Sequence, residues 1–131
     1  MKYLILAIIY LAATTVSCNK SDSNMAIPNG TYVGTFQRLT NNAGQISKVT
    51  LTFSGGNWTG QSQYAKYPAL CNGSYATNGT AVTFKNLCVW TAEFDWSLIL
   101  SSDYQYKLSG SSLQITRNTN LYQDIYKLTK L

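Results

Sequence analysis

Apolar and polar residues alternate along most of the chain. Val49, Leu51 and Phe53 take every second position of one run, and Lys or hydroxyl residues fill the gaps between them. The run 95–101 has the same period of two. Because successive side chains of a strand point to opposite faces, this period predicts half-buried β-strands and not helices. The other runs of strand character are 31–37, 58–64, 74–77, 81–85, 104–108, 113–116 and 122–129.

Short segments rich in Gly, Asn, Ser and Asp separate these runs and supply turn chemistry. Even spacing of short strands and tight turns predicts an all-β protein built as an antiparallel up-and-down meander of about eight strands. Closing the meander into a barrel removes its exposed edges, so we expect an up-and-down barrel, with a β-sandwich as the alternative. No long helix is predicted, and the segment 87–94 is the best place for an irregular connection.

The N-terminal segment has the composition of an export signal. Lys2 precedes an apolar run from Tyr3 to Ala13, and small or polar residues follow up to Cys18. This run is shorter than the about 20 residues that span a bilayer. The pattern resembles a bacterial lipoprotein signal peptide over residues 1–17, which implies lipidation of Cys18; an ordinary secretory signal is the alternative. The polar stretch 19–24 predicts a flexible tether over 18–28, and 29–131 form one domain.

Two cysteines remain after such processing, Cys71 and Cys88. Outside the cytoplasm a disulfide is the expected state of such a pair, and it would contribute roughly 3 kcal/mol to stability. Asn78-Gly79 between them predicts a hairpin with a two-residue turn, in which Thr77 faces Thr80. In that register the cysteines miss direct opposition by two residues, so a bulge or loosened strand ends would have to bring them together.

The charge pattern argues against nucleic acid as a partner. The chain has 10 basic and 5 acidic residues and a net charge of +5, which falls to +4 when Lys2 leaves with the signal. The basic residues are spread singly along the sequence, whereas a nucleic-acid interface carries a dense cluster. We expect no metal site either, because two cysteines without any histidine cannot complete a typical zinc shell.

The absence of histidine also excludes Ser-His-Asp, Cys-His and His-metal catalysis. The one carboxylate pair to consider is Glu93 with Asp95, which would share a face of a strand beside aromatic residues and could in principle hydrolyse a glycoside. Charges at the junction of a loop and a strand more often serve solvation or turn hydrogen bonding. We therefore predict a protein that is not an enzyme and needs no cofactor.

Aromatic residues are abundant, with 10 tyrosines and 3 tryptophans. Those at alternating positions of the strands are expected in the core, where aromatic rings pair across strands. A functional hypothesis assigns a second group to the mouth of the barrel, where large amphipathic rings could bind a small apolar molecule. The residues of this predicted binding site are Trp58, Trp90, Trp96, Tyr104 and Tyr106.

The segments 29–36 (Asn-Gly-Thr-Tyr-Val-Gly-Thr-Phe) and 122–128 (Tyr-Gln-Asp-Ile-Tyr-Lys-Leu), the meander and the cysteine pair together resemble the small lipocalin-like lipoproteins of Gram-negative cell envelopes. The resemblance implies a protein attached by its lipid to the envelope, at the outer membrane, on a face that the sequence leaves open. It also implies two alternative functions. One is binding of a small apolar or amphipathic molecule in the barrel, and the other is contact with an envelope protein, for example as an inhibitor, through the barrel loops.

Overall fold

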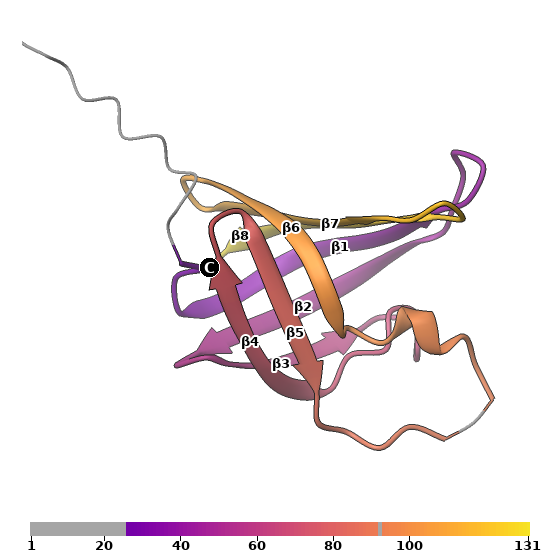
Figure 1. Cartoon of the computed structure of the whole chain (residues 1–131), viewed down its shortest axis with the longest axis horizontal. Helices are drawn as coiled ribbons and strands as arrows, with labels where there is room; N and C mark the ends of the chain where they lie inside the picture. The colour runs from indigo at the N-terminus through magenta and orange to yellow at the C-terminus, as the bar shows by residue number, and fades with distance from the viewer. Residues whose placement is uncertain (1–25, 92) are drawn as a thin grey trace, which may run out of the picture.

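The computed structural model describes residues 26–91 and 93–131, which form a closed barrel of eight antiparallel strands in chain order (Figure 1). Because β1 pairs with both β2 and β8, the barrel has no free edge. The predicted meander and its closure into a barrel are confirmed, and the alternative of a β-sandwich is not. Cys18, the predicted signal 1–17 and most of the predicted tether lie outside the described residues. The strands are β1 (Gly30–Leu39), β2 (Ile46–Ser54), β3 (Asn57–Ser62), β4 (Asn72–Asn78), β5 (Ala81–Asn86), β6 (Ser102–Ser109), β7 (Ser112–Asn118) and β8 (Gln123–Lys130).

Aromatic and aliphatic side chains from the inward positions fill the interior of the barrel. Phe84 lies at the centre of this core and meets the rings of Trp58 and Tyr104 edge to face, at 6.1 and 5.7 Å between ring centroids. Tyr126 contacts Phe36 at 4.8 Å. Edge-to-face pairs of this kind add to the free energy of burying the rings. The other fully buried large side chains include Tyr32, Leu51, Phe53, Val82, Leu100, Leu113 and Ile115.

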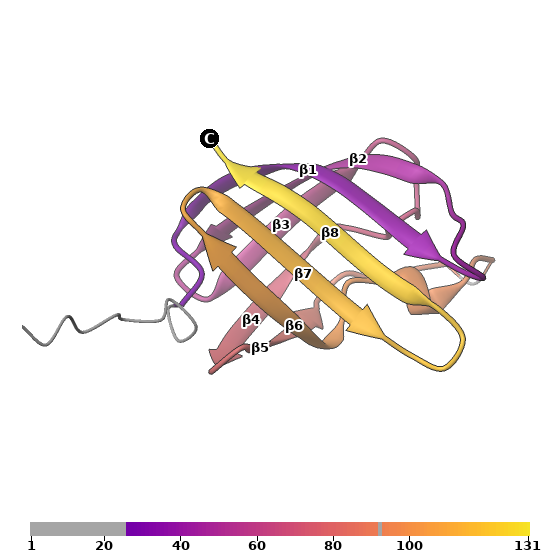
Figure 2. The ribbon, with the colours of Figure 1, turned by 90° about the horizontal axis from the view of Figure 1, so that it is seen from above.

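The two ends of the barrel are covered differently. At the end where β1 begins, Ile27 is buried and the Tyr32 hydroxyl donates a hydrogen bond to the Pro28 carbonyl at 2.8 Å. The connections after β1, β3, β5 and β7 all lie at the opposite end, which we call the loop end (Figure 2). The longest of these connections, residues 87–101, joins β5 to β6 and carries the short 3-10 helix η2 (Trp96–Leu98).

The prediction of a strand over 95–101 is therefore wrong, and the irregular connection extends beyond 87–94. Asp95 caps η2, because its carboxylate accepts a hydrogen bond from the Ser97 backbone N–H. Trp96 is 56% exposed, whereas Leu100 is buried in the core. The apolar residues 96, 98 and 100 alternate in sequence, but they lie in a capped helical turn with no buried residue and in the segment after it, so their alternation imitates a strand.

The predicted register of the β4–β5 hairpin is also wrong. Asn78 pairs with Ala81, so the two-residue turn consists of Gly79 and Thr80 rather than Asn78 and Gly79. Gly79 has a φ of 62° at the first central position, the position that a type II′ turn gives to glycine. This shift of one residue in the turn moves the pairing by two and places Cys71 opposite Cys88, without a bulge.

Candidate functional site

The connection 87–101 carries exposed apolar side chains at the loop end. Leu87, Val89 and Trp96 are 69%, 97% and 56% exposed. Single exposed apolar residues are common on protein surfaces, but several on one loop mark an interaction site more often than chance does. We therefore take this loop as the candidate functional site.

Three aromatic rings of the loop pack against one another. The ring centroids of Trp90 and Phe94 are 5.7 Å apart, and those of Phe94 and Trp96 are 6.4 Å apart. The ammonium group of Lys66, from the connection between β3 and β4, lies 4.9 Å from the Phe94 centroid, a cation–π distance. We call Trp90, Phe94 and Trp96 the aromatic platform. These ring contacts restrict the side-chain conformations of the platform in the free protein.

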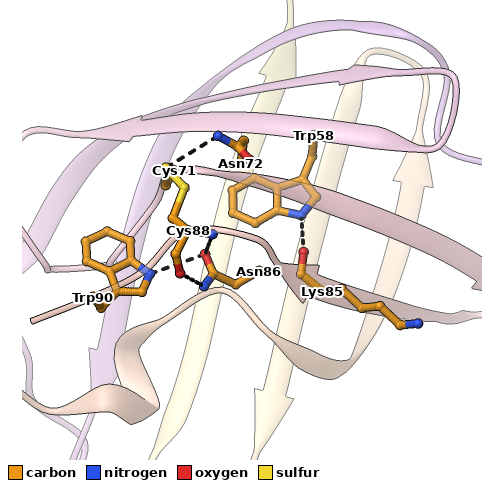
Figure 3. The surroundings of a disulfide bond; sticks show 7 residues. All are labelled: Trp58, Cys71, Asn72, Lys85, Asn86, Cys88 and Trp90. Carbon is orange, nitrogen blue, oxygen red and sulfur yellow. Dashed lines mark hydrogen bonds between the residues drawn. A yellow bond between two sulfur atoms is a disulfide. The ribbon is translucent and has the colours of Figure 1, made fainter.

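A disulfide and a side-chain amide fix the start of the loop (Figure 3). Cys71 and Cys88 are bonded, which confirms the predicted disulfide. Asn86 donates from Nδ2 to the Cys88 carbonyl at 2.7 Å. The same amide accepts the Trp90 indole N–H on Oδ1 at 3.2 Å. Trp90 is thus connected through Asn86 to the residue that carries the disulfide.

Backbone hydrogen bonds fix the other end of the loop. The Ala69 N–H donates to the Leu98 carbonyl at 2.9 Å, and the Leu100 N–H donates to the Ala69 carbonyl at 3.2 Å. The Asp95 carboxylate accepts the Ser97 hydroxyl at 2.6 Å in addition to the Ser97 N–H. Among the described residues of the connection, the backbone bonds to residues outside it are made by Leu87 at one end and by Leu98 and Leu100 at the other.

Beneath the loop lies a cluster of buried charges that sequence reasoning missed. Arg38 donates from Nε and Nη2 to the two carboxylate oxygens of Asp124 at 2.7 and 2.8 Å. Arg117 donates from Nη2 to the same carboxylate at 2.7 Å. The side chains of Arg38, Asp124 and Arg117 are 9%, 1% and 15% exposed. The Tyr122 ring covers Arg38 at 3.7 Å, and the Tyr104 ring lies 4.7 Å from Arg117.

Both arginines of this ion network also hold the loop. Arg38 Nη1 donates to the Asp95 carboxylate at 3.1 Å and to the Ser97 hydroxyl at 2.6 Å. Arg117 Nη2 donates to the Ser97 carbonyl at 2.7 Å. A single aspartate cannot balance two arginines, so Asp95 supplies the second negative charge. The connection 87–101 is therefore attached electrostatically to the wall of the barrel.

These contacts favour a structural role for Asp95. The hydrogen bond from the Ser97 hydroxyl, followed by the Ser97 N–H and the charges of Arg38 and Arg117, lowers the pKa of Asp95 despite some desolvation. A carboxyl group with a lowered pKa is a poor general acid. Glu93 and Asp95 do not share a strand face, because both lie in the irregular connection. The geometry that the glycosidase hypothesis required is thus not present.

The structure divides the five predicted binding residues into two groups. Trp90 and Trp96 belong to the aromatic platform. Trp58, Tyr104 and Tyr106 are inside the barrel, with exposures of 1%, 2% and 8%, so placing them at the mouth was wrong. The Trp58 indole N–H donates to the Lys85 carbonyl at 3.2 Å (Figure 3). These three residues are core residues because their strand positions point inward.

One signal could have identified the ion network. Arg38 stands two residues after Phe36, and Asp124 two residues before Tyr126, so each charge occupies the inward phase of its strand. A charge at a core position needs a partner, because an unpaired buried charge is very costly. The ion pairs of this network join β1, β7 and β8, and β1 comes beside β8 only when the barrel closes.

Comparisons of the chain with protein-family models, curated proteins and solved structures found no match. Within residues 26–91 and 93–131, no helix is long and apolar enough to cross a membrane. The same residues contain no group of three or more Cys, Asp or Glu side chains placed to hold a metal ion. The fold and the loop geometry therefore carry the functional argument.

Proposed function

We propose that this protein is a non-enzymatic binding protein that presents the connection 87–101 to a protein partner in the cell envelope. The observation that carries this proposal is the exposure of Leu87, Val89 and Trp96 on a loop that is fixed at both ends. Tryptophan is enriched among the few residues that supply most of the binding free energy at the centre of protein interfaces, and surrounding apolar residues exclude water from them.

The packed interior of the barrel supports this alternative over binding of a small molecule inside it. Ring contacts link Tyr32, Phe53, Phe84, Tyr104 and Tyr126 through the core. Because these rings fill the interior, a ligand could enter the barrel only if several of them moved together. An apolar molecule would have to bind at the loop end instead, where Trp90 and Trp96 lie.

The fixed ends of the loop favour binding because they reduce the entropy that is lost on association. Immobilising a side chain at an interface costs about 0.5–1.5 kcal/mol. The disulfide, Asn86 and the two arginines already hold the two ends of the loop in the free protein. The barrel thus acts as a rigid support for a small apolar surface.

The direction of the chain suits a protein attached by its N-terminus. β1 begins at the end of the barrel opposite the connection 87–101. We propose that lipidation of Cys18 attaches the protein to the envelope membrane. An anchor on that side leaves the aromatic platform facing away from the lipid, where it is accessible to another protein.

Site-specific photo-crosslinking in intact envelopes tests the proposed function. A photoreactive residue at position 89 should give a discrete protein adduct, since Val89 is 97% exposed. The matched control carries the same residue at Thr80, which is exposed in the turn at the opposite end. Adding Leu87→Ser and Trp96→Ser should abolish the adduct at position 89 without lowering the melting temperature.

Two results would overturn the proposal. The first is an absence of adducts at position 89, or equal adducts at positions 89 and 80. The second is saturable quenching of tryptophan emission by small apolar molecules that Trp90→Ala weakens, in a protein that captures no partner. That outcome would move the ligand-binding hypothesis from the barrel interior to the loop.

A further inference from the structure

Three exposed lysines lie in one row across the outer face of the barrel. Lys107 pairs with Gln114, and Gln114 pairs with Lys127 on its other side. Lys127 pairs with Thr35, which in turn pairs with Lys48. The lysines are far apart in sequence, and the register of β6, β7, β8, β1 and β2 brings them into line. We call Lys107, Lys127 and Lys48 the lysine row.

The spacing of the lysine row follows from strand geometry. Directly opposed residues of antiparallel strands have Cα atoms about 5.5 and 4.5 Å apart in alternation, so lysines on every second strand are about 10 Å apart. β6, β7, β8 and β1 lie side by side across the view of Figure 2. The row crosses these strands and follows the curvature of the wall onto β2.

The charges around the row are unbalanced. Among the described carboxylates, Asp124 is inside the barrel and Glu93 and Asp95 are in the connection 87–101. Asp103 is the one described carboxylate on the outer face of these five strands, and its carboxylate accepts the Thr83 hydroxyl at 2.6 Å. Within residues 26–91 and 93–131, no carboxylate lies within salt-bridge distance of the three ammonium groups of the row.

Two open grooves flank the row. One, of about 380 Å³, is lined by Lys107, Gln114, Lys127, Ser109, Ser112 and Thr129. The other, of about 540 Å³, runs along β1, β2 and β3, and its lining includes Lys48, Thr35, Thr50, Gln61 and Gln63. Val33 and Val49 make much of the β1–β3 groove apolar, and Leu113 and Leu128 contribute to the other, so hydroxyl, amide and ammonium groups stand between apolar surfaces that sugar rings can cover. Neither lining contains an aromatic ring, which a surface for stacking nucleic-acid bases would have.

We propose that the lysine row and its two grooves bind an acidic polysaccharide. The row offers one cation per about 10 Å, a spacing of the order of two sugar residues, so that every second carboxylate of a uronic-acid polymer can meet a lysine. Serine, threonine and glutamine side chains provide donors and acceptors for the sugar hydroxyl groups between the charges. A flexible chain can follow a curved wall, whereas a flat bilayer would touch only part of the row. This surface is separate from the aromatic platform, so it adds a second binding function.

Affinity measurements with polygalacturonate, a polymer of uronic acid, test the proposal. Calorimetry or retention on an immobilised column should detect binding that weakens as salt increases. The triple variant Lys48→Gln, Lys107→Gln, Lys127→Gln should bind about tenfold more weakly, as expected from the loss of three exposed ion pairs. The matched control Lys66→Gln, Lys85→Gln, Lys130→Gln removes the same charge from positions outside the row and should keep most of the affinity. Melting temperatures of both variants verify their folding.

A matched ligand separates sugar recognition from simple charge attraction. Fully methyl-esterified polygalacturonate keeps the sugar chain and loses the carboxylates, so it should not bind. Polyglutamate keeps the carboxylates and lacks the sugar, so it should bind more weakly than polygalacturonate. Equal losses in the two triple variants, equal binding of polyglutamate, or row-dependent binding to anionic vesicles without binding to polygalacturonate would each overturn the proposal. None of these measurements depends on a protein partner for the connection 87–101.

Discussion

Cys71 faces Cys88 across the continuation of the β4–β5 ladder, with their Cα atoms 6.3 Å apart. The ladder pairs Gly73 with Asn86, and the Leu87 N–H donates to the Asn72 carbonyl one step further. The disulfide therefore closes a hairpin whose register already opposes its two ends. Because Cys88 lies at the start of the connection 87–101, the same bond that stabilises the barrel also fixes this end of the loop.

Removing the disulfide should destabilise the protein by about 3 kcal/mol, because a cross-link between residues 71 and 88 restricts the unfolded chain. Urea unfolding of the Cys71→Ser, Cys88→Ser variant measures this loss. Reductant should lower the stability of the wild type by a similar amount and leave the double variant unchanged. Two thiols that are freely alkylated in the native protein would contradict the bond.

Lipidation of Cys18 predicts incorporation of labelled palmitate into the wild-type protein. The Cys18→Ala variant should incorporate no label and should appear in the soluble fraction. The variant Cys71→Ser, Cys88→Ser controls for labelling at other cysteines, and it should incorporate palmitate like the wild type. Equal labelling of wild type and Cys18→Ala would refute the lipid anchor and the envelope location together.

Asp124→Asn should be among the most destabilising single substitutions in the barrel. Its carboxylate accepts from both Arg38 and Arg117 and is buried, so the change leaves two cations close together with no negative charge inside. Breaking a buried ion pair on one side costs about 3–5 kcal/mol. Urea unfolding provides the measurement.

The control for Asp124→Asn is Asp103→Asn, an equal change of charge on the outer face. Asp103 is exposed and its carboxylate accepts a hydrogen bond from the Thr83 hydroxyl, so its loss should cost less than about 1 kcal/mol. Similar losses in the two variants would show that the network contributes no more than an exposed hydrogen bond. A variant of Asp124 that fails to fold and recovers with the additional change Arg38→Met would support the role of charge balance.

The alternation of side chains predicted the barrel because every strand buries one face against a single core. Phe36 with Tyr32, and Tyr126 with Leu128, follow the inward phase without exception. The same rule failed at Trp96 to Leu100, where a capped 3-10 turn reproduces the strand period over a few residues. The alternation alone does not separate these two structures, because Asp95 caps the turn locally and also pairs with the distant Arg38.

Contacts and registers between strands that are far apart in the chain could not be predicted from the sequence. The turn of β4–β5 has Gly79 at its first central position, and its second residue, Thr80, contacts β6. The Thr80 carbonyl accepts from the Tyr106 N–H at 2.8 Å. The lysine row likewise exists only in the register of five strands, which is why its members seemed scattered along the chain.

The attachment of the loop through Asp95 should weaken in acid. The lowered pKa means that the folded protein holds this carboxyl group ionised at pH values where the unfolded chain has begun to bind a proton. The contribution of Asp95 to stability is therefore complete above the ordinary aspartate pKa of about 3.9 and is lost as the pH falls through the lower pKa of the folded state. Because the side chain is 60% exposed, we expect the contribution to be no more than about 1 kcal/mol.

The backbone amide of Ser97 offers a direct measurement of this titration, since its N–H donates to the Asp95 carboxylate at 3.0 Å. Its NMR chemical shift followed against pH should have a midpoint below about 3.9. The Asp95→Asn variant should lose that titration while keeping the fold, and its stability should fall less steeply in acid than that of the wild type. Arg38→Lys, which weakens the contact from the other side, should move the midpoint upward. A Ser97 midpoint at or above the ordinary aspartate pKa would show that Asp95 does not hold the loop.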